Sequence, residues 1–242
     1  MKDVTRDSIS LRGAGIVQIT QPKKGHRFTL DSILLADFCR IKPDERVLEP
    51  GAGTGIISIL LARKIPKATF FAVEVQPDAA RLCRQNVLKN ELDDHVIVLE
   101  RDIRQLPPSV LPKTFEAIVA NPPYTKLGTG RKSPGPERQT ARQDQSAGLE
   151  AWLDLHYSLK NKGRYFIVFP ANRVAELTSL MRSRKLEPKR ARFVHPYHDK
   201  PAALVLIEAV KSAGVGLEVM PPLIVHEQGG GYTEEMREIY GL

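Results

Sequence analysis

The stretch Arg46-Val47-Leu48-Glu49-Pro50-Gly51-Ala52-Gly53-Thr54-Gly55 decides the fold of this chain. Its first four residues predict a short buried strand, and apolar residues at helical spacing follow the glycines, namely Ile56, Ile57, Leu60 and Leu61. Glycine lets the backbone turn sharply and approach a ligand without a Cβ in the way. The stretch therefore predicts a strand, a ligand-binding turn and a helix in direct succession.

Strand and helix patterns continue to alternate towards the carboxyl terminus. Further strands are predicted over residues 68–75, 95–99, 115–120, 164–169, 192–195 and 202–209. The alternation predicts an α/β fold with a doubly wound, seven-stranded, mostly parallel sheet and helices on both of its faces. No helix-length segment separates the last two strands, so we expect the final strand to be antiparallel to its neighbour.

The pattern indicates a single domain over residues 1–242. Glycines and Pro22 in residues 1 to about 28 favour a short N-terminal extension with extended or hairpin structure. Residues from about 212 to 242 are predicted to form a peripheral C-terminal tail. The sequence provides no linker that would separate a second domain.

Composition narrows the class of protein and its partners. The chain has 242 residues and a net charge of +8, which favours an anionic partner, nucleic acid first and an anionic membrane second. Its two cysteines, Cys39 and Cys83, are too few and too far apart for a disulfide framework or a metal cluster. The N-terminus lacks the apolar core of a signal peptide, and no apolar run approaches the roughly 20 residues that span a bilayer. We therefore expect a cytoplasmic protein with neither a membrane nor a metal among its partners.

Acidic residues accompany the glycine turn and the ends of the next two strands. The turn has the spacing Gly-x-Gly-x-Gly, which differs from the Gly-x-Gly-x-x-Gly of the dinucleotide fingerprint and makes NAD a minor alternative. Glu74 ends the second strand about twenty residues further on, where a carboxylate can accept hydrogen bonds from both ribose hydroxyls. Asp102 closes the third strand, where it is placed to meet the base of the same ligand.

This combination resembles the class I S-adenosylmethionine (SAM) methyltransferase family, whose turn carries a Glu or Asp before the same glycine spacing. The resemblance implies a Rossmann-like methyltransferase fold with SAM as cofactor. It also implies that Gly51 and Gly53 contact the methionine moiety, Glu74 the ribose and Asp102 the adenine. Glu49 would meet the cofactor's ammonium group through water, and Gly55 and Asn121 complete the predicted cofactor site.

The predicted fourth strand, residues 115–120, leads directly into Asn121-Pro122-Pro123-Tyr124. Ligands of open α/β sheets bind at the carboxyl ends of strands, and two prolines make this turn stiff. The Asn121 side-chain oxygen and the Pro122 carbonyl can each accept a hydrogen from a planar NH2 group, while Tyr124 can stack on its ring. The alternative is a proline-terminated strand with a turn aromatic. The same tetrapeptide occurs in methyltransferases that modify exocyclic or amide nitrogens.

The resemblance extends to the bacterial tRNA(Val) adenine-N6 methyltransferase family. The segment from Phe28 to Ala36 is similar to that family's Phe-x-x-Asp-x-x-Leu-Leu-Ala, and the segments from Pro222 to His226 and from Gly231 to Thr233 resemble its ending. In that family the target is the adenosine just 3′ of the tRNA anticodon. Family members often carry Ala-Arg-His-Glu where residues 141–144 read Ala-Arg-Gln-Asp.

Basic residues flank both ends of the predicted acceptor site and fit tRNA as the partner, because lysine and arginine neutralise phosphates. The predicted RNA-binding residues are Lys23, Lys24, Arg27, Lys126, Arg131, Lys132, Arg138 and Arg142. Two related alternatives remain, a protein methyltransferase acting on a glutamine amide of release factors and a ribosomal RNA guanine-N2 methyltransferase. A non-catalytic nucleic-acid-binding module that kept the fold is a third alternative.

Overall fold

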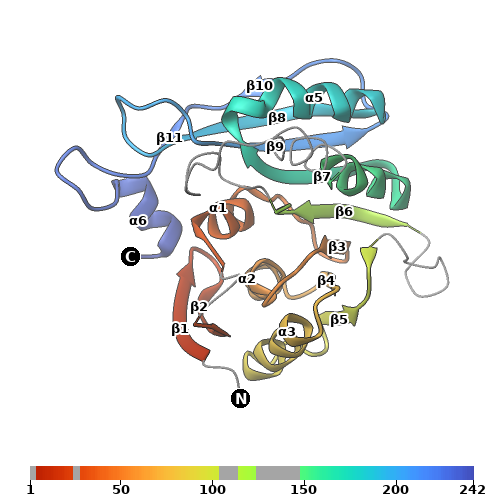
Figure 1. The fold of residues 1–242 in the computed structure, drawn as a ribbon, viewed down its shortest axis with the longest axis vertical. Helices are drawn as coiled ribbons and strands as arrows, with labels where there is room; N and C mark the ends of the chain where they lie inside the picture. Colours follow the sequence, from red (N-terminus) through yellow and green to blue (C-terminus); the bar gives the residue numbers. More distant parts are fainter. Residues whose placement is uncertain (1–3, 24–27, 104–113, 124–147) are drawn as a thin grey trace, which may run out of the picture.

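A computed structural model describes residues 4–23, 28–103, 114–123 and 148–242 (Figure 1). Strands and helices alternate through most of the chain, as the sequence predicts. The main elements are β3 (Arg46–Pro50), α2 (Ile56–Lys64), β4 (Thr69–Glu74), α3 (Pro77–Lys89), β5 (Val96–Glu100), β6 (Phe115–Ala120), β7 (Leu159–Pro170), α5 (Val174–Ser183), β8 (Leu186–His195) and β9 (Leu204–Lys211).

The strands form one large, mostly parallel sheet in the order β10 (Glu218–Val219), β8, β9, β7, β6, β3, β4 and β5. The five strands from β5 to β7 are parallel, and β9 lies antiparallel between β7 and β8. The predicted doubly wound sheet and its antiparallel last long strand are therefore confirmed. Two short strands beyond the predicted seven, β10 (Glu218–Val219) and β11 (Leu223–Ile224), pair with β8.

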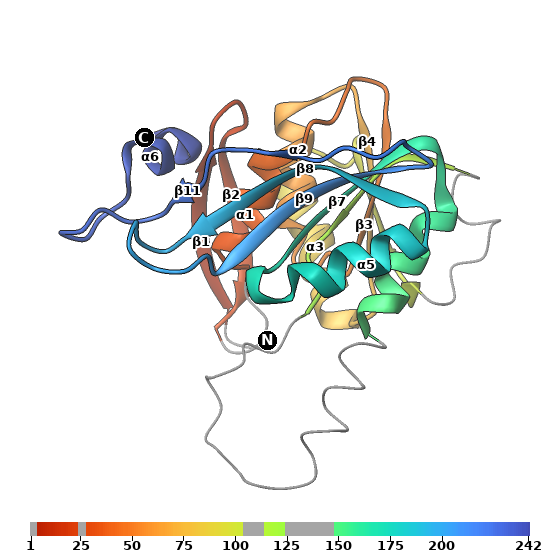
Figure 2. The same cartoon turned by 90° about the horizontal axis from the view of Figure 1, so that it is seen from above.

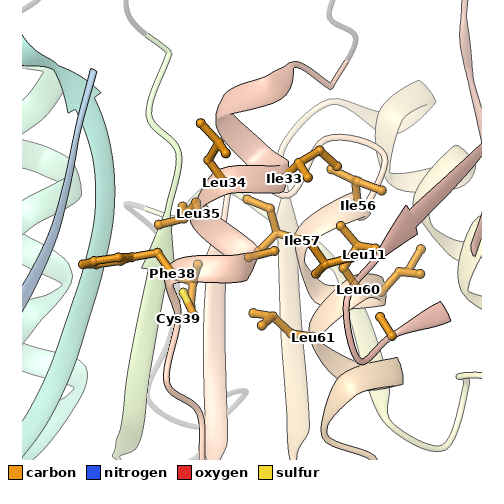
Figure 3. Packing of buried hydrophobic residues seen from close by; sticks show 14 of the residues in the cluster. Leu11, Ile33, Leu34, Leu35, Phe38, Cys39, Ile56, Ile57, Leu60 and Leu61 are labelled. Carbon is orange, nitrogen blue, oxygen red and sulfur yellow. The ribbon is translucent and has the colours of Figure 1, made fainter. Parts of the chain in front are cut away.

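Helices cover both faces of the sheet, so the central strands are apolar on both sides. Side chains of β6 alternate between two buried clusters: Ala117 and Val119 face one cluster, and Ile118 and Ala120 face the other. The first cluster includes α1 (Leu30–Phe38) and α2, and the second includes α5 and the helical residues 148–154. Figure 3 shows Ile57 of α2 lying between the side chains of α1 and Leu11. None of the helices in the described ranges is long and apolar enough to cross a membrane.

An N-terminal hairpin packs beside this core. Strands β1 (Val4–Leu11) and β2 (Gly15–Pro22) are antiparallel along their whole length, so of the two expected conformations, extended or hairpin, these residues form the hairpin. Helix α6 (Glu234–Tyr240), which the sequence analysis did not predict, lies beside β1 (Figures 1 and 2). Its Met236 and Ile239 are buried in the first cluster, so the end of the chain contributes to the core.

Candidate functional site

A cavity of about 660 Å³ opens at the carboxyl edge of the sheet, where β3, β4 and β6 end. This volume is within the range of small-molecule sites. The order of the sheet reverses at β3, with β4 on one side and β6 on the other, which is where open α/β sheets bind ligands. Residues from the glycine turn, the ends of β4 and β6, the hairpin and the start of α1 line the cavity.

Glu74, at the end of β4, fastens the glycine turn to the sheet. Its carboxylate accepts hydrogen bonds from the Gly53 N–H and the Gln76 N–H, each at 2.8 Å. The side chain is buried yet lines the cavity. The carboxylate predicted to meet the ribose therefore also determines the conformation of the turn, because its two oxygens bond different backbone segments.

Glu49 lies at the end of β3, buried at 3% exposure. One of its oxygens accepts hydrogen bonds from the backbone N–H of Ser58, at 2.9 Å, and from the Ser58 hydroxyl. Burial raises the pKa of Glu49 from 4.5 to about 7, because desolvation outweighs the two Ser58 hydrogen bonds, and the nearby Glu74 adds to the rise. Glu49 is thus a carboxyl group in the cavity wall that ionises near neutral pH.

The three glycines of the turn face different neighbours. A Cβ on Gly53 would meet nothing within 4 Å, so this residue faces open space, and its φ of +57° is a glycine conformation. A Cβ on Gly51 would lie 2.4 Å from the Trp152 ring, and one on Gly55 would lie 2.5 Å from the sulfur of Cys83. Gly53 therefore leaves room for a ligand, whereas Gly51 and Gly55 make room for side chains of this chain.

Some of the predicted site residues line the cavity, and others do not. Glu49, Gly51, Gly53 and Glu74 line it together with Asn121, Pro122 and Pro123. Gly55 and Asp102 are not among its lining residues, although Asp102 follows β5 at the same edge of the sheet. Lys23 is exposed just after β2. Tyr124 and the predicted RNA-binding residues other than Lys23 lie outside the described residues; the latter are Lys24, Arg27, Lys126, Arg131, Lys132, Arg138 and Arg142.

Asn121 is positioned directly after β6, and its side chain contacts α1. The Asn121 Nδ2 group donates a hydrogen bond to the hydroxyl of Ser32, with 3.1 Å between the two atoms. Both residues line the cavity. The end of β6 and the first turn of α1 therefore meet across the same space that Glu74 and Gly53 face.

Several residues of the site were missed by the sequence analysis. Ser58 holds Glu49, Trp152 covers Gly51, and Asn86 bridges the hairpin and the glycine turn by donating to the carbonyls of Thr20 and Thr54. Ser32 lies in the segment singled out for its resemblance to a family motif, which was its only signal. Within the described residues, no group of three or more His, Cys, Asp and Glu side chains is arranged to hold a metal ion.

Comparison with known proteins agrees with this geometry. The family model described as Methyltransferase small domain matches residues 27–133. A tRNA1(Val) (adenine(37)-N6)-methyltransferase of Vibrio campbellii is 27% identical over 222 residues, which cover 90% of each chain. The protein of the same name from Haemophilus influenzae is 30% identical over 154 residues, covering 63% of this chain and 65% of its own.

Solved structures show the same fold. A predicted O-methyltransferase of Agrobacterium tumefaciens aligns with a TM-score of 0.68 at 21% identity, covering 88% of this chain and 96% of its own. A SAM-dependent O-methyltransferase of Thermotoga maritima aligns with a TM-score of 0.53 at 20% identity, covering 80% and 69%. The chain is a SAM-dependent methyltransferase of Rossmann-like fold, and it resembles the bacterial tRNA(Val) adenine-N6 methyltransferases.

Proposed function

We propose that this enzyme transfers the methyl group of SAM to the exocyclic N6 amine of an adenosine in the anticodon loop of tRNA. One observation carries the proposal: Asn121, with an amide oxygen suited to an NH2 group, lines the same cavity as Glu74 and Gly53. The printed names of the relatives, which specify adenine 37 of tRNA1(Val), support the same acceptor. A tRNA substrate also implies a cytoplasmic location.

The residues around Gly53 fit SAM. The open space beside Gly53 would receive the methionine moiety, the Glu74 carboxylate would accept hydrogen bonds from the ribose hydroxyls, and Asp102 would serve the adenine. Glu49 ionises near neutral pH, so its carboxylate suits the cofactor's ammonium group. When bound, SAM supplies an electrophilic methyl group on a sulfonium.

The acceptor side of the cavity explains how a weak nucleophile would react. The N6 lone pair of adenine is delocalised into the ring. Hydrogen bonds from the NH2 group to the Asn121 Oδ1 atom and the Pro122 carbonyl would orient that lone pair and stabilise the positive charge that develops on nitrogen. Tyr124 would stack on the base and hold it in line with the methyl group. The product nitrogen is acidic, so it loses its proton without a strong general base.

The tRNA would bind through the basic residues on either side of the acceptor site. Lys23 and its neighbours Lys24 and Arg27 precede α1, and the rest follow Tyr124 in the chain. An anticodon-loop base is already unpaired, so its entry into the cavity costs less than extraction from a duplex. No metal ion has a role in this scheme.

The proposal is tested by incubating the purified protein with labelled SAM and, in separate reactions, bulk tRNA, ribosomal RNA or a release-factor protein, followed by nucleoside mass spectrometry of the RNA. We expect N6-methyladenosine, and tRNA from a deletion strain should lack it at the corresponding position. Label found only in a release-factor protein, or only in guanine N2 of ribosomal RNA, would contradict the proposal. Binding of SAM itself is measurable separately, because Trp152 lines the cavity and is the sole tryptophan of the chain.

The role of Asn121 is tested by Asn121→Ala. We expect turnover to fall by at least about tenfold while SAM affinity stays nearly unchanged, because Asn121 acts on the acceptor. SAM affinity is followed by the fluorescence of Trp152. A loss confined to SAM binding would show that Asn121 serves the cofactor instead.

A further inference from the structure

The hydrogen bond between Asn121 and Ser32 joins two segments that are 89 residues apart. Its donor is the Nδ2 group of Asn121 and its acceptor is the Ser32 hydroxyl. With the amide nitrogen used in this bond, Oδ1 is the atom of the amide that can accept a hydrogen bond from a substrate, and Asn121 lines the cavity. The Ser32 hydroxyl is the acceptor in this arrangement, and the bond ties the Asn121 side chain to α1.

The two ends of an amide have opposite hydrogen-bonding properties. Oδ1 accepts hydrogen bonds, whereas Nδ2 donates them. The amine nitrogen of the substrate carries hydrogens, so it donates a hydrogen bond to Oδ1 but is repelled by Nδ2, which is also a donor. A half-turn of the Asn121 side chain would therefore replace an attractive contact with two facing donors, although both orientations occupy almost the same volume.

Ser32 is held in place by the packing of its helix. It is 4% exposed and lies in α1, where the next residues, Ile33 to Ala36, are exposed by 1% or less. These side chains anchor α1 in the first buried cluster. The hydroxyl is thereby fixed to the core of the protein, not to a surface loop.

We propose that Ser32 is a positioning residue for methyl transfer: its hydroxyl holds the Asn121 amide with Oδ1 directed at the amine of the substrate. This inference rests on the proposed function, since it assigns Ser32 a task through Asn121. Ser32 makes no bond to the reacting nitrogen in this scheme. Its effect is on the orientation of Asn121, and hence on turnover, with binding of SAM and tRNA unchanged.

The test is a double-mutant cycle in which kcat is measured with saturating SAM and tRNA. Ser32→Ala should lower kcat about fivefold, the size expected for one net hydrogen bond, and leave the KM values for SAM and tRNA within about twofold. In the Asn121→Ala background the same substitution should have almost no further effect, because the side chain that Ser32 positions is absent. Ser32→Thr keeps the hydroxyl and should retain most of the turnover.

A matched control separates positioning from damage to α1. Cys39 is another small buried side chain, next to the end of the same helix, and Cys39→Ala should leave kcat unchanged. If Ser32→Ala lowers kcat equally in both backgrounds, or has no effect on kcat, Ser32 does not act through Asn121. If Asn121→Ala alone leaves kcat unchanged, the acceptor role of Asn121 in the proposed function fails, and the role of Ser32 fails with it.

Discussion

At the scale of single residues, the glycine turn combines three different requirements in five positions. Gly51 and Gly55 are needed because the Trp152 ring and the Cys83 sulfur occupy the space where a Cβ would lie. Gly53 has open space on that side and accepts a positive φ. A motif that looks uniform in sequence therefore has one position for the ligand and two for internal packing.

Gly53→Ala separates ligand contact from backbone strain. We expect SAM affinity to fall at least about tenfold, because the new methyl group enters the cavity, and stability to fall by about 1 kcal/mol from the left-handed conformation. Calorimetry with SAM and urea unfolding measure the two effects. Gly15→Ala is the control, since Gly15 has a φ of +69° and open space but lies at the start of β2, next to the hairpin turn. Equal SAM affinity in the two variants would show that the cofactor does not contact Gly53.

Glu49 makes stability depend on pH in the direction opposite to an ordinary paired carboxylate. Its pKa is raised from 4.5 to about 7 in the folded protein by burial. Below pH 4.5 it is protonated in both states. Between pH 4.5 and about 7 it ionises in the unfolded chain but stays protonated in the folded one, so stability falls as pH rises and then becomes constant.

Glu49→Gln should remove this dependence. The free energy of unfolding of the variant, relative to the wild type, is expected to rise by about 3 kcal/mol between pH 4.5 and pH 7.5, measured by urea unfolding across that range. Ser58→Ala should extend the pH-dependent window upwards, because it removes the hydroxyl hydrogen bond that lowers the pKa of Glu49, while the backbone N–H bond remains. A constant difference between Glu49→Gln and the wild type at all pH values would show that the carboxyl ionises normally.

At the scale of secondary-structure elements, α3 holds the hairpin through two asparagines one helical turn apart. Asn90 accepts from the Gln18 N–H at 2.9 Å and donates to the Gln18 carbonyl at 2.8 Å. Asn86 makes the same pair of bonds with Thr20, at 2.7 and 2.9 Å. The two amides bond β2 as a neighbouring strand would, which places Thr20 and Pro22 in the wall of the cavity.

Asn90→Ala should loosen the hairpin without altering the catalytic edge. We expect faster hydrogen exchange at the Gln18 amide, which loses its acceptor, and a loss of about 1–2 kcal/mol in the free energy of unfolding. Lys89→Ala, at the neighbouring exposed position of α3, is the control and should leave Gln18 protected. Unchanged exchange in Asn90→Ala would mean that pairing with β1 alone holds the strand.

At the scale of the whole molecule, several arginines of the C-terminal half are held in ion pairs within the protein. Arg184 bonds Glu150 and Asp154, and Arg190 pairs with Glu208. Arg192 likewise pairs with Glu235. These paired arginines are therefore not the expected contacts of an anionic partner. The predicted RNA-binding residues are the candidates for that role.

Charge reversal distinguishes a specific tRNA surface from the overall charge of +8. Arg131→Glu with Lys132→Glu should weaken tRNA binding and reduce the slope of log affinity against log salt concentration by about two. Lys42→Glu with Lys67→Glu changes the net charge equally. These two exposed lysines precede β3 and β4, at the edge of the sheet opposite the cavity, and their loss should have little effect. Filter binding from 50 to 200 mM salt measures both, and equal slopes would contradict a localised surface.

The sequence by itself determined the alternation of strands and helices, the glycine turn and the carboxyl-edge location of Glu74 and Asn121. Those features follow from local rules: hydrophobic period, turn chemistry and the fact that parallel strands end at one edge. It also predicted an antiparallel last long strand, because the connection was too short for a helix. Helix α6 was missed because its sequence is short. What stabilises the helix is the burial of Met236 and Ile239 beside the hairpin, which the sequence does not show.

Tertiary structure alone decided the contacts that complete the site. Ser32 reaches Asn121 across 89 residues, Asn86 reaches Thr20 across 66, and Trp152 lies over Gly51. Such pairs have no period or spacing in the sequence, because each depends on how distant elements are packed against the same sheet. Local patterns in the sequence therefore determine where the site lies. The orientation of the groups within the site depends on the packed fold.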